Sequence, residues 1–358
     1  MNEVGQTSGK LLSFLALDRY AARLCGIRVS GDALSWTRFC GSMSLALVLL
    51  LFFSGAFMMF YYSPTPAAAY DSVDFAQFSL PFGDIVRGVH YWAWNLLLVV
   101  LGLHVAGTFL IAAYKTPRQL VWISGVLTLI VVPFCIVTGD LLPWDQKGYW
   151  TTQVRNSIIS SVPLAGDFML RLLQGGPRTG TMALTRFYVL HCVFLPLLIV
   201  KLIAIHFHFL AQSGLSEQVT AGKTPRSAIS LFPDLLNRWL IMFIACAVAL
   251  GLVSYYWPVP LESPADPTDS AYVPKPEWWV FALNQLVGIF RGPLMVIGTV
   301  VIPGGLFLLM IVLPFLDRTP ARHPSQRKLA MAVGLLIFAA AVGLSLLGYY
   351  EHFVKPHL

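Results

Sequence analysis

The stretch RGVHYWAWNLLLVVLGLHVAG (residues 87–107) holds two histidines, His90 and His104, 14 residues apart in an apolar run. A second apolar run, HCVFLPLLIVKLIAIH (residues 191–206), begins with His191 and ends with His206, 15 residues later. At about 100° per residue, 14 steps return to within about 40° of the starting direction, and 15 steps overshoot by about 60°. Each run is therefore predicted to be a helix with both histidines on one face, about 21 Å apart along the axis.

The composition places both runs inside a membrane. Hydrophobic residues make up 57% of the 358 residues and charged residues only 11%, whereas a soluble domain has about 25% charged residues. About 20 apolar residues are needed to cross a bilayer core. This length predicts an all-α membrane protein with seven spans, at residues 39–62, 88–113, 121–141, 186–211, 236–257, 293–315 and 329–350.

The charges predict an orientation and a division into units. The 24 Lys and Arg residues exceed the 17 Asp and Glu residues, which gives a net charge of +7. They lie in short connections between apolar runs, which favours a topology signal over a nucleic-acid surface. The positive-inside rule then predicts a multi-pass protein with a cytoplasmic N-terminus and a C-terminus on the outer side. The membrane that we expect is a bacterial-type inner (cytoplasmic) membrane, in which the outer side is periplasmic. The predicted units are a cytoplasmic arm (1–38), a four-helix bundle (39–215), a cytoplasmic linker (216–235) and a three-helix part (236–358).

The histidines of the second and fourth predicted spans suit haem binding. Because both spans run inward, His90 comes level with His191 near the outer side, and His104 with His206 near the inner side. Two imidazoles from opposite helices can ligate a six-coordinate haem iron, so the spacings predict two stacked, non-covalent b-type haems. A lone membrane histidine is more often a hydrogen-bonded core residue or part of a proton path, but four at matched spacings favour ligation. The five cysteines form no CxxC pair, which argues against covalent attachment through CxxCH, a zinc site or a disulfide framework.

Two glycine pairs repeat the 14-residue spacing of the first histidine pair. Gly41 and Gly55 lie in the first predicted span, and Gly125 and Gly139 lie in the third. Small residues also mark plain helix contacts in membranes. Glycine permits close backbone approach to a flat macrocycle because it has no side chain, and the shared spacing favours this second interpretation.

Two long connections lie on the predicted outer side. Segment 142–185 contains SVPLAGDFMLRLLQGG (161–176), which predicts a short amphipathic helix along the membrane interface. Segment 258–292 is rich in proline before Glu277, which predicts a rigid, extended excursion, and then continues as FALNQLVGIF (281–290), which partly returns toward the membrane. Long structured loops on one side usually shape a site.

These motifs resemble those of a known family. The haem-binding half of cytochrome b, from the cytochrome bc and b6f quinol-oxidising complexes, is similar to RGVHYW (87–92), VTGDLLPWDQKGYW (137–150) and LTRFYVLHCVFLPLL (184–198). The quinol-binding half, a separate three-span subunit in photosynthetic complexes, is similar to FPDLL (232–236), SPADPT (263–268), PEWW (276–279) and IPGGLFLLMIVLPFLD (302–317). The resemblance covers about residues 35–350. The 15-residue histidine step and the three last spans resemble the photosynthetic type with its two pieces fused.

The resemblance implies that quinol is oxidised at the outer side. In the family a PEWY-type motif supplies a glutamate that accepts a quinol proton, and the motif here consists of Pro276, Glu277, Trp278 and Trp279. The structural alternative is a Pro-Glu pair that starts a helix, with the carboxylate favoured by the helix dipole. Trp279 stands where the family has tyrosine. Since indole donates a hydrogen bond but does not exchange a proton as phenol can, any tyrosine-dependent hydrogen bond at this position is in doubt.

The resemblance also implies roles for residues around this pocket and the haems. It puts the pocket wall near Gly148 and Tyr149. Arg87 and Arg118 are suited to pair with haem propionates, which are anions at a membrane boundary. Arg118 serves equally well as a topology-setting charge, whereas Arg87 lies on the side where the charge bias gives it no such purpose.

Photosynthetic-type relatives carry an extra haem, held by a cysteine near the start of the first span and by a basic residue after the last haem histidine. In this sequence Phe39 and Ala211 occupy these two positions, and Cys40 is one residue away, which turns its side chain by about 100°. An extra covalent haem is therefore not expected. His208 points to a different face from His206 and is interpreted as an interfacial histidine rather than a quinone ligand.

The resemblance implies a transmembrane electron-transfer subunit that works only with its partner subunits, in a homodimeric complex. Quinol would give one electron to a Rieske iron-sulfur protein and a c-type cytochrome, and the other would cross both haems to a quinone at the inner side, coupled to proton translocation. One alternative is a dihaem membrane anchor that links the quinone pool to a non-Rieske partner and does not need the PEWW excursion. Another is a transporter, which predicts broken spans that the sequence does not show.

Overall fold

The computed structural model describes residues 28–29, 36–176, 178–213, 229–230 and 236–355. Within these residues, seven helical stretches are long and apolar enough to cross a membrane, so the predicted seven-span, all-α fold is confirmed. Their bounds are Phe39–Met59, Gly83–Leu110, Gln119–Gly139, Thr181–Ser213, Leu236–Tyr256, Gly292–Leu316 and Lys328–Val354.

Two spans begin earlier than the apolar runs predicted. The second helix begins at Gly83 rather than 88, and the fourth helical stretch begins at Thr181 rather than 186. In both cases the added residues are mostly polar or small, as in GDIVR and TMALT. Backbone hydrogen bonding extends a helix beyond the apolar slab that hydropathy detects, so span length and helix length differ.

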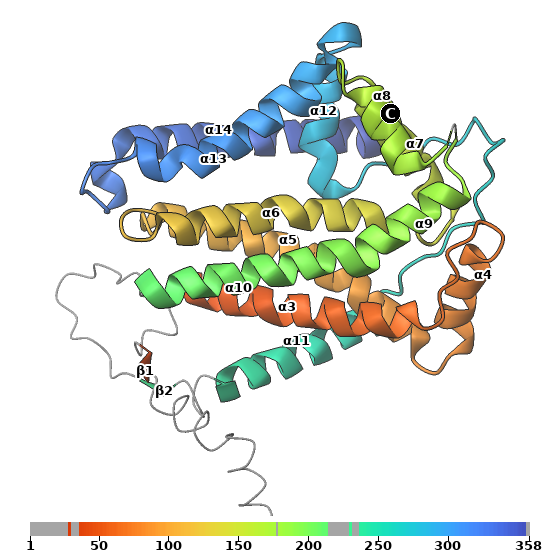
Figure 1. Ribbon diagram of the computed structural model, residues 1–358, viewed down its shortest axis with the longest axis horizontal. Coiled ribbons are helices and arrows are strands. Elements are labelled where there is room, and N and C mark those ends of the chain that lie inside the picture. Colours follow the sequence, from red (N-terminus) through yellow and green to blue (C-terminus); the bar gives the residue numbers. More distant parts are fainter. Residues whose placement is uncertain (1–27, 30–35, 177, 214–228, 231–235, 356–358) are drawn as a thin grey trace, which may run out of the picture.

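A bundle of four spans occupies the centre of the molecule (Figure 1). Its elements are α3 (Trp36–Met59), α5 (Gly83–Leu110), α6 (Gln119–Gly139), and the continuous span α9 (Thr181–Val189), η2 (Leu190–Phe194) and α10 (Leu195–Ser213). α3 packs along α5, and α6 packs along α10. Buried apolar side chains such as Leu47, Leu97, Val132 and Ile199 close the space between them. This core fixes the relative positions of the two histidine-bearing spans.

The remaining spans lie on two opposite flanks of this bundle. α11 (Leu236–Tyr256) packs on α3 and α5, whereas α13 (Ile302–Leu316) packs on α6. Figure 1 shows α11 below α3, with α13 and α14 (Lys328–Tyr349) above α6. The helices of the segment predicted as a three-helix part therefore lie on two opposite sides of the bundle and do not form a separate unit on one side of it.

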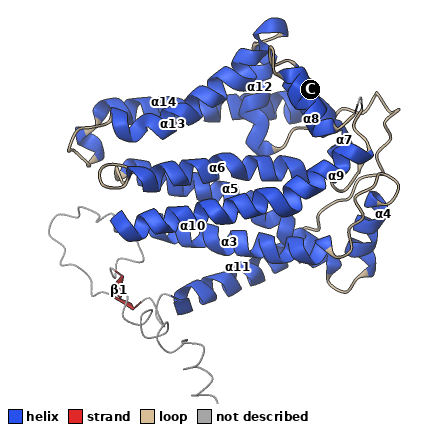
Figure 2. Cartoon of the chain, in the orientation of Figure 1, coloured by secondary structure: helices blue, strands red, loops and turns tan. Residues whose placement is uncertain are grey.

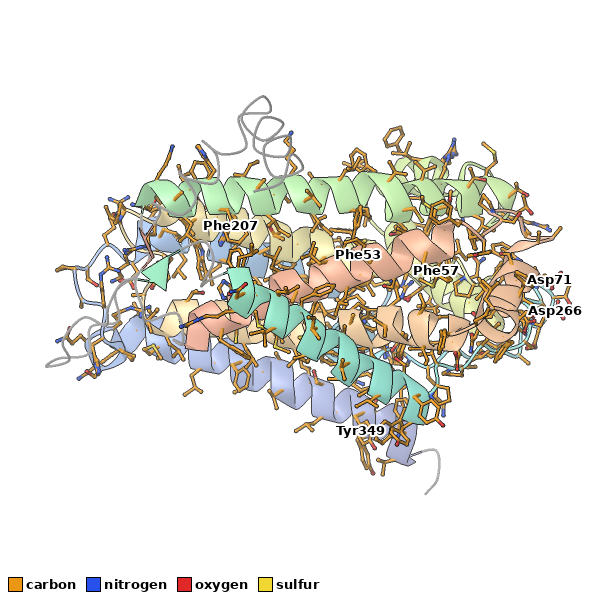
Figure 3. The ribbon with its side chains drawn as sticks, turned by 90° about the horizontal axis from the view of Figure 1, so that it is seen from below. Phe53, Phe57, Asp71, Phe207, Asp266 and Tyr349 are labelled. Atoms are coloured by element: carbon orange, nitrogen blue, oxygen red, sulfur yellow. The ribbon has the colours of Figure 1, made fainter. Side chains whose placement is uncertain are left out.

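One end of the bundle, here called the His90 end, carries most of the connecting structure. Its elements are α4 (Ala69–Asp74), η1 (Phe75–Ser79), α7 (Gln146–Ser160) and α8 (Gly166–Gln174). α8 lies within the stretch predicted as an amphipathic helix, exposes Phe168 and Leu172, and ends at Gly175 in a left-handed conformation with φ 71°. The exposed Asp71 and Asp266 both lie at this end, and Phe207 lies toward the other (Figure 3).

A segment that we call the strap, residues 258–276, crosses the His90 end from α11 toward α12 (Figure 1). It is fixed to the start of α7 by backbone hydrogen bonds, from the Gln146 amide to the Ser263 carbonyl at 2.9 Å and from the Ala265 amide to the Trp144 carbonyl at 3.0 Å. The predicted extended excursion is therefore not a free loop. It holds one flank of the molecule against the bundle.

The chain beyond the strap consists of short helices and two spans (Figure 2). In chain order the elements other than α13 and α14 are η4 (Trp278–Val280), α12 (Phe281–Ile289), η5 (Gly292–Leu294), η6 (Ile297–Val301), η7 (Pro324–Gln326) and η8 (Tyr350–Val354). α12 corresponds to the partly apolar stretch FALNQLVGIF. It packs against α14, so it closes the second flank near the His90 end.

At the opposite end, four side chains form a buried polar cluster that we call the clasp: Tyr114, Lys115, Asp317 and Arg327. The Asp317 carboxylate accepts hydrogen bonds from Lys115 Nζ at 2.7 Å, Tyr114 Oη at 2.6 Å and Arg327 Nε at 2.9 Å. Burial alone would raise the pKa of Asp317, but these hydrogen bonds outweigh it and hold the pKa well below its ordinary value. The clasp joins the turn after α5 to the turn between α13 and α14.

A two-residue antiparallel pair, β1 (Arg28–Val29) with β2 (Ile229–Ser230), connects the region before the first span to the region before the fifth. This pair does not change the fold class. Most of the predicted cytoplasmic arm (1–38) and linker (216–235) lies outside the described residues, together with Cys25.

Candidate functional site

His90 of α5 and His191 of η2 face each other near the His90 end. Their ring centroids are 6.1 Å apart, and the ring planes are inclined by 70°. Nδ1 of His191 donates to the Cys135 carbonyl at 2.8 Å. Nδ1 of His90 lies 2.9 Å from Ser54 Oγ, whose own hydroxyl donates to the Leu50 carbonyl, so the serine oxygen accepts from the imidazole. Both rings are thereby oriented through Nδ1, which leaves Nε2 of each ring as the nitrogen that could ligate a metal.

The spacing of these two rings fits an iron between them. Metal–imidazole nitrogen bonds are about 2 Å long, and two of them on opposite sides of one metal put the ring centres about 6 Å apart. The observed 6.1 Å agrees with this value. Among the described residues there is no cluster of three or more His, Cys, Asp or Glu side chains that could hold a bare metal ion. Two histidine ligands with a macrocycle around the metal therefore suit the site better than a protein-only metal centre.

The second pair, His104 of α5 and His206 of α10, lies toward the opposite end of the bundle. The two histidines interact electrostatically. Nδ1 of His206 lies 3.2 Å from Ser124 Oγ, whose hydroxyl donates to the Val121 carbonyl at 2.9 Å. Serine thus orients one histidine of each pair in the same way, through an oxygen that accepts from Nδ1.

Each predicted glycine lies against one histidine ring. An added Cβ at Gly41 or Gly55 would lie 3.1 Å from Cε1 of His104 or His90, and at Gly125 it would lie 3.3 Å from Cε1 of His206. At Gly139 it would lie only 2.5 Å from Cε1 of His191, closer than side chains approach one another. The 14-residue spacing predicted that these glycines allow close approach of a flat macrocycle. In the structure, the groups that approach the glycines are the histidine rings. These glycines let the Cε1 edge of each imidazole approach the neighbouring helix closely.

The π-helical turn η2 explains why a 15-residue step keeps two histidines on one face. A π turn inserts one extra residue into an α-helix, which cancels about 100° of rotation. η2 spans Leu190–Phe194, at the start of the interval from His191 to His206. The remaining rotation is that of 14 α-helical steps, the same as between His90 and His104. The overshoot of about 60° that a regular helix would give is therefore absent.

A cavity of about 440 Å³ adjoins the His90–His191 pair. Its walls come from α3, α4, η1, α5, α6, the start of α7, the fourth span, the strap and the start of η4, and they include Gly55, Arg87, His90, Gly139, Lys147, Gly148, His191, Glu262 and Glu277. One cavity therefore brings together a ligand-candidate pair and the glutamate of the PEWW motif. The sequence predicted these two features from stretches far apart in the chain.

Glu277 is turned toward α7 and not toward the helix it precedes. It occupies the N-cap position of η4, but its side chain makes no capping hydrogen bond there. Its carboxylate instead forms an ion pair with Lys147, and its side chain is 12% exposed. Glu277 thus stands at a helix start, as in the structural alternative, but its side-chain hydrogen bond is to Lys147 and not to the helix.

The two tryptophans of the motif have different surroundings. Trp278 Nε1 donates to Asn95 Oδ1 at 2.7 Å, which ties the motif to α5. Trp279 packs on the bundle core, and its buried Nε1 has no hydrogen-bond partner among the described residues. The position that carries tyrosine in the PEWY motif is thus occupied by a packing residue.

Gly148 and Tyr149 separate at the start of α7. Gly148 lines the cavity, and an added Cβ there would lie 2.3 Å from the Asp140 carbonyl oxygen, so no side chain fits. Tyr149 turns away and packs edge-on against Trp144 and Trp150, with ring centroids 5.6 and 5.4 Å away. Burial raises the pKa of the Tyr149 hydroxyl. Of the two predicted wall residues, the structure brings Gly148 to the cavity and places Tyr149 in the adjoining aromatic cluster.

Comparison with known proteins agrees with this arrangement. Residues 95–264 match the family model described as cytochrome b(N-terminal)/b6/petB. Cytochrome b6 of Synechococcus sp. (strain CC9605) is 39% identical over 176 residues, which cover 49% of this chain and 81% of that protein. The chain belongs to the cytochrome b family. Cytochrome b6 of Prochlorococcus marinus (strain MIT 9303) gives the same identity and coverage.

A solved structure extends the similarity of this cytochrome b to nearly its whole length. A chain of the hyperthermophilic respiratory Complex III superposes with a TM-score of 0.77 at 25% identity, over 92% of this chain and 88% of that one. The protein is therefore a multi-pass membrane subunit for electron transfer in a bc/b6f-type complex, as predicted from the motifs. Membership of the family implies b-type haems and partner subunits.

The two arginines assigned to propionates differ in their surroundings. Arg87 lines the cavity of this cytochrome b and donates to Gln77 Oε1 at 2.5 Å, to the Val259 carbonyl at 3.1 Å and to the Pro260 carbonyl at 3.2 Å. It thus connects α5 to η1 and to the strap. Arg118 lies at the N-cap of α6, at the opposite end. A propionate role for either residue stays a prediction.

The residues considered for an extra haem or an inner quinone are placed as follows. Cys40 is buried in the bundle core, whereas Phe39 is 47% exposed on the surface of α3. Ala211 is exposed on α10. His208 is exposed and lies 3.1 Å from Gln212 Nε2, which is the arrangement of a surface histidine.

Sequence reasoning missed three contributors to the site: Lys147, Ser54 and Ser124. Lys147 is visible in DQKGYW, but its partner Glu277 lies 130 residues away, and no local pattern connects them. The two serines lie on α3 and α6, one residue before Gly55 and Gly125. A Ser-Gly pair recurring in two spans was a usable signal, because the serine can orient the histidine that the glycine accommodates.

Proposed function

We propose that this cytochrome b oxidises quinol at the His90 end and passes electrons through two stacked b haems to a quinone at the opposite end, coupled to proton translocation. The observation that carries the proposal is the cavity that Glu277 shares with the His90–His191 pair. A quinol bound there would meet a proton acceptor and an electron acceptor in one space.

The chain's own groups have separate tasks in this proposal. Bound haem would supply the electron-carrying group, held by His90 with His191 and by His104 with His206. Ser54, Ser124 and the Cys135 carbonyl hold three of these imidazoles by their Nδ1 atoms. Glu277 would accept a quinol proton, since its carboxylate lies at the cavity wall.

The same proposal places the protein in a bacterial-type inner membrane, with the His90 end on the outer (p) side. A Rieske iron-sulfur protein and a c-type cytochrome would receive one electron there, in a homodimeric complex. The excess of Lys and Arg near the opposite end supports this orientation by the positive-inside rule.

A second candidate is a dihaem anchor that passes electrons between the quinone pool and a non-Rieske partner. The Lys147–Glu277 ion pair favours this candidate, because a glutamate engaged in an ion pair can be purely structural. In that case neutralising Glu277 would leave quinol oxidation intact.

Quinol oxidation by the purified complex distinguishes the two candidates. We expect Glu277→Gln to lower the rate at least about 10-fold, because glutamine does not accept a proton. Glu351→Gln is a matched control, since it neutralises an exposed glutamate on η8. A redox difference spectrum of each variant checks that the haems are retained. A Glu277→Gln complex that turns over like Glu351→Gln would favour the anchor.

A further inference from the structure

We propose that Lys147 is the positioning residue for Glu277: its ammonium holds the carboxylate at the cavity wall, and its charge influences the acid limb of quinol oxidation. The proposal rests on the proposed function, since it assigns Glu277 the proton-accepting role. It concerns a residue of α7 that neither the PEWW motif nor the histidine pairs identify.

Lys147 is poorly placed for the stability of its own helix. It is the second residue of α7, where the positive end of the helix dipole disfavours a cation. Its side chain is 38% exposed. Burial would lower the pKa of Lys147, but the charge and the hydrogen bond of Glu277 outweigh it and raise the pKa above its ordinary value. The contact that explains the position of this lysine is therefore the one to Glu277.

The segments that carry the two residues are fixed to each other. The side chain of Asp145 caps α7 by accepting from the Gly148 amide at 2.8 Å. The amide of Asp266, in the strap, donates to Gln146 Oε1 at 3.0 Å, next to Lys147. These contacts supplement the backbone hydrogen bonds between the strap and α7. The start of α7, which carries Lys147, and the strap that leads to Glu277 are therefore hydrogen-bonded to each other, unlike the partners of an isolated surface ion pair.

Other acidic groups near Lys147 have partners of their own. Asp140, at the end of α6, is in an ion pair with Arg155. Glu262 of the strap accepts from the Tyr272 hydroxyl at 2.6 Å, and Asp145 is engaged as the α7 cap. Among these acidic groups, Glu277 is the one that forms an ion pair with Lys147.

The remaining charged and titratable groups around the pair come from α5 and the fourth span. Tyr91 of α5 interacts electrostatically with both Lys147 and Glu277. Arg87 lines the same cavity but donates to Gln77 and to strap carbonyls. His90 and His191 line it as well and are oriented as ligand candidates. Of the basic groups that line this cavity, Lys147 is therefore the one that donates a hydrogen bond to Glu277.

The consequence for proton transfer follows from charge balance. When a quinol hydroxyl gives its proton to Glu277, the quinol O–H bond breaks and a carboxyl O–H bond forms, while the electrons leave to the one-electron acceptors of the proposed reaction. The carboxyl group is then neutral, and the ammonium of Lys147 loses its counter-charge. Since an adjacent cation disfavours the neutral carboxyl, Lys147 should keep Glu277 ready to accept at lower pH and speed the release of its proton.

The test compares three variants of the complete complex. Lys147→Met removes the charge but keeps the apolar stem, Lys147→Arg keeps the charge, and Lys275→Met removes a strap lysine whose Nζ lies over the Phe353 ring, 5.0 Å from its centroid. We expect the acid limb of quinol oxidation to move about one pH unit upward in Lys147→Met. Lys147→Arg should restore it to near the wild-type position, and Lys275→Met should leave it unchanged.

A second readout is independent of turnover. Infrared titration of the complex reports the Glu277 carboxyl as the band that Glu277→Gln removes, and its midpoint should rise by about the same amount in Lys147→Met. Equal midpoints in Lys147→Met and Lys275→Met would overturn the role of Lys147. If Glu277→Gln left quinol oxidation unchanged, the proposed function would fail, and the infrared midpoint would still decide on the ion pair. If Lys147→Met lost its haem spectrum, Lys147→Gln would take its place in both measurements.

Discussion

Four glycines and four histidines form one-to-one contacts across neighbouring helices. The contacts at Gly41, Gly55 and Gly125 leave 3.1 to 3.3 Å for an added Cβ, but Gly139 leaves only 2.5 Å to Cε1 of His191. At the first three positions a shift of a few tenths of an ångström relieves the clash. At Gly139 the imidazole itself has to move, and it is already fixed through Nδ1 to the Cys135 carbonyl.

We therefore expect Gly139→Ala to disturb the proposed haem at the His90 end. Displacing His191 changes the metal–ligand geometry, so that haem should lose occupancy or shift in midpoint potential while the other keeps its own. Potentiometric titration of the purified complex measures both. Gly102→Ala is the control, because nothing lies within 4 Å of a Cβ at this α5 position. Indistinguishable titrations of the two variants would contradict the argument.

Single residues also show what the sequence can reveal. The histidine and glycine spacings were readable because helix periodicity converts sequence distance into direction. The Lys147–Glu277 pair was not readable, since its two members belong to segments that meet only after the strap crosses the bundle. Trp279 was recognised as a departure from the PEWY motif, but its packing on the core required the structure.

Among the elements, η2 has the clearest effect on the site. In a regular α-helix, the side chains of His191 and His206 would point in directions that differ by about 60°. No local signal in LHCVF indicates a π turn. The turn is visible only in the backbone hydrogen bonds of residues 190–194.

A deletion tests the function of this turn. Removing Val193 from η2 should convert the span to a regular helix with a 14-residue step, so both proposed haems should be retained. Removing Val99 from α5 should rotate His104 by about 100° relative to His90 and abolish one haem. The two valines are each 46% exposed, so the deletions are matched. The redox difference spectrum counts the haems, and equal loss in both deletions would exclude a compensating role for η2.

For the whole molecule, the clasp and the strap join the last three spans to the bundle at opposite ends. The basic residues near the clasp were interpreted as topology-setting charges. The structure buries two of them, Lys115 and Arg327, against Asp317. Charge counting could not foresee this, because the acidic partner is one residue among several in a polar turn.

We expect Asp317→Asn to destabilise the complex by about 3 kcal/mol, because it leaves two buried cations without a counter-charge. Since the pKa of Asp317 is lowered, its contribution is full above the ordinary carboxyl pKa and disappears as pH falls through the lowered value. Wild type and variant should therefore converge only in strong acid. Thermal unfolding in detergent measures the difference, with Asp266→Asn, at the exposed His90 end, as the control.

The placement of α11 on one flank and α13 on the other has a consequence for biosynthesis. The ribosome completes the four central helices before it makes residue 258, where the strap begins. During that interval the pocket beside His90 and His191 lacks the wall that Val259, Glu262 and Glu277 later provide. The strap side of this pocket is therefore synthesised after the four helices that carry the histidines and glycines, and before α13 and α14.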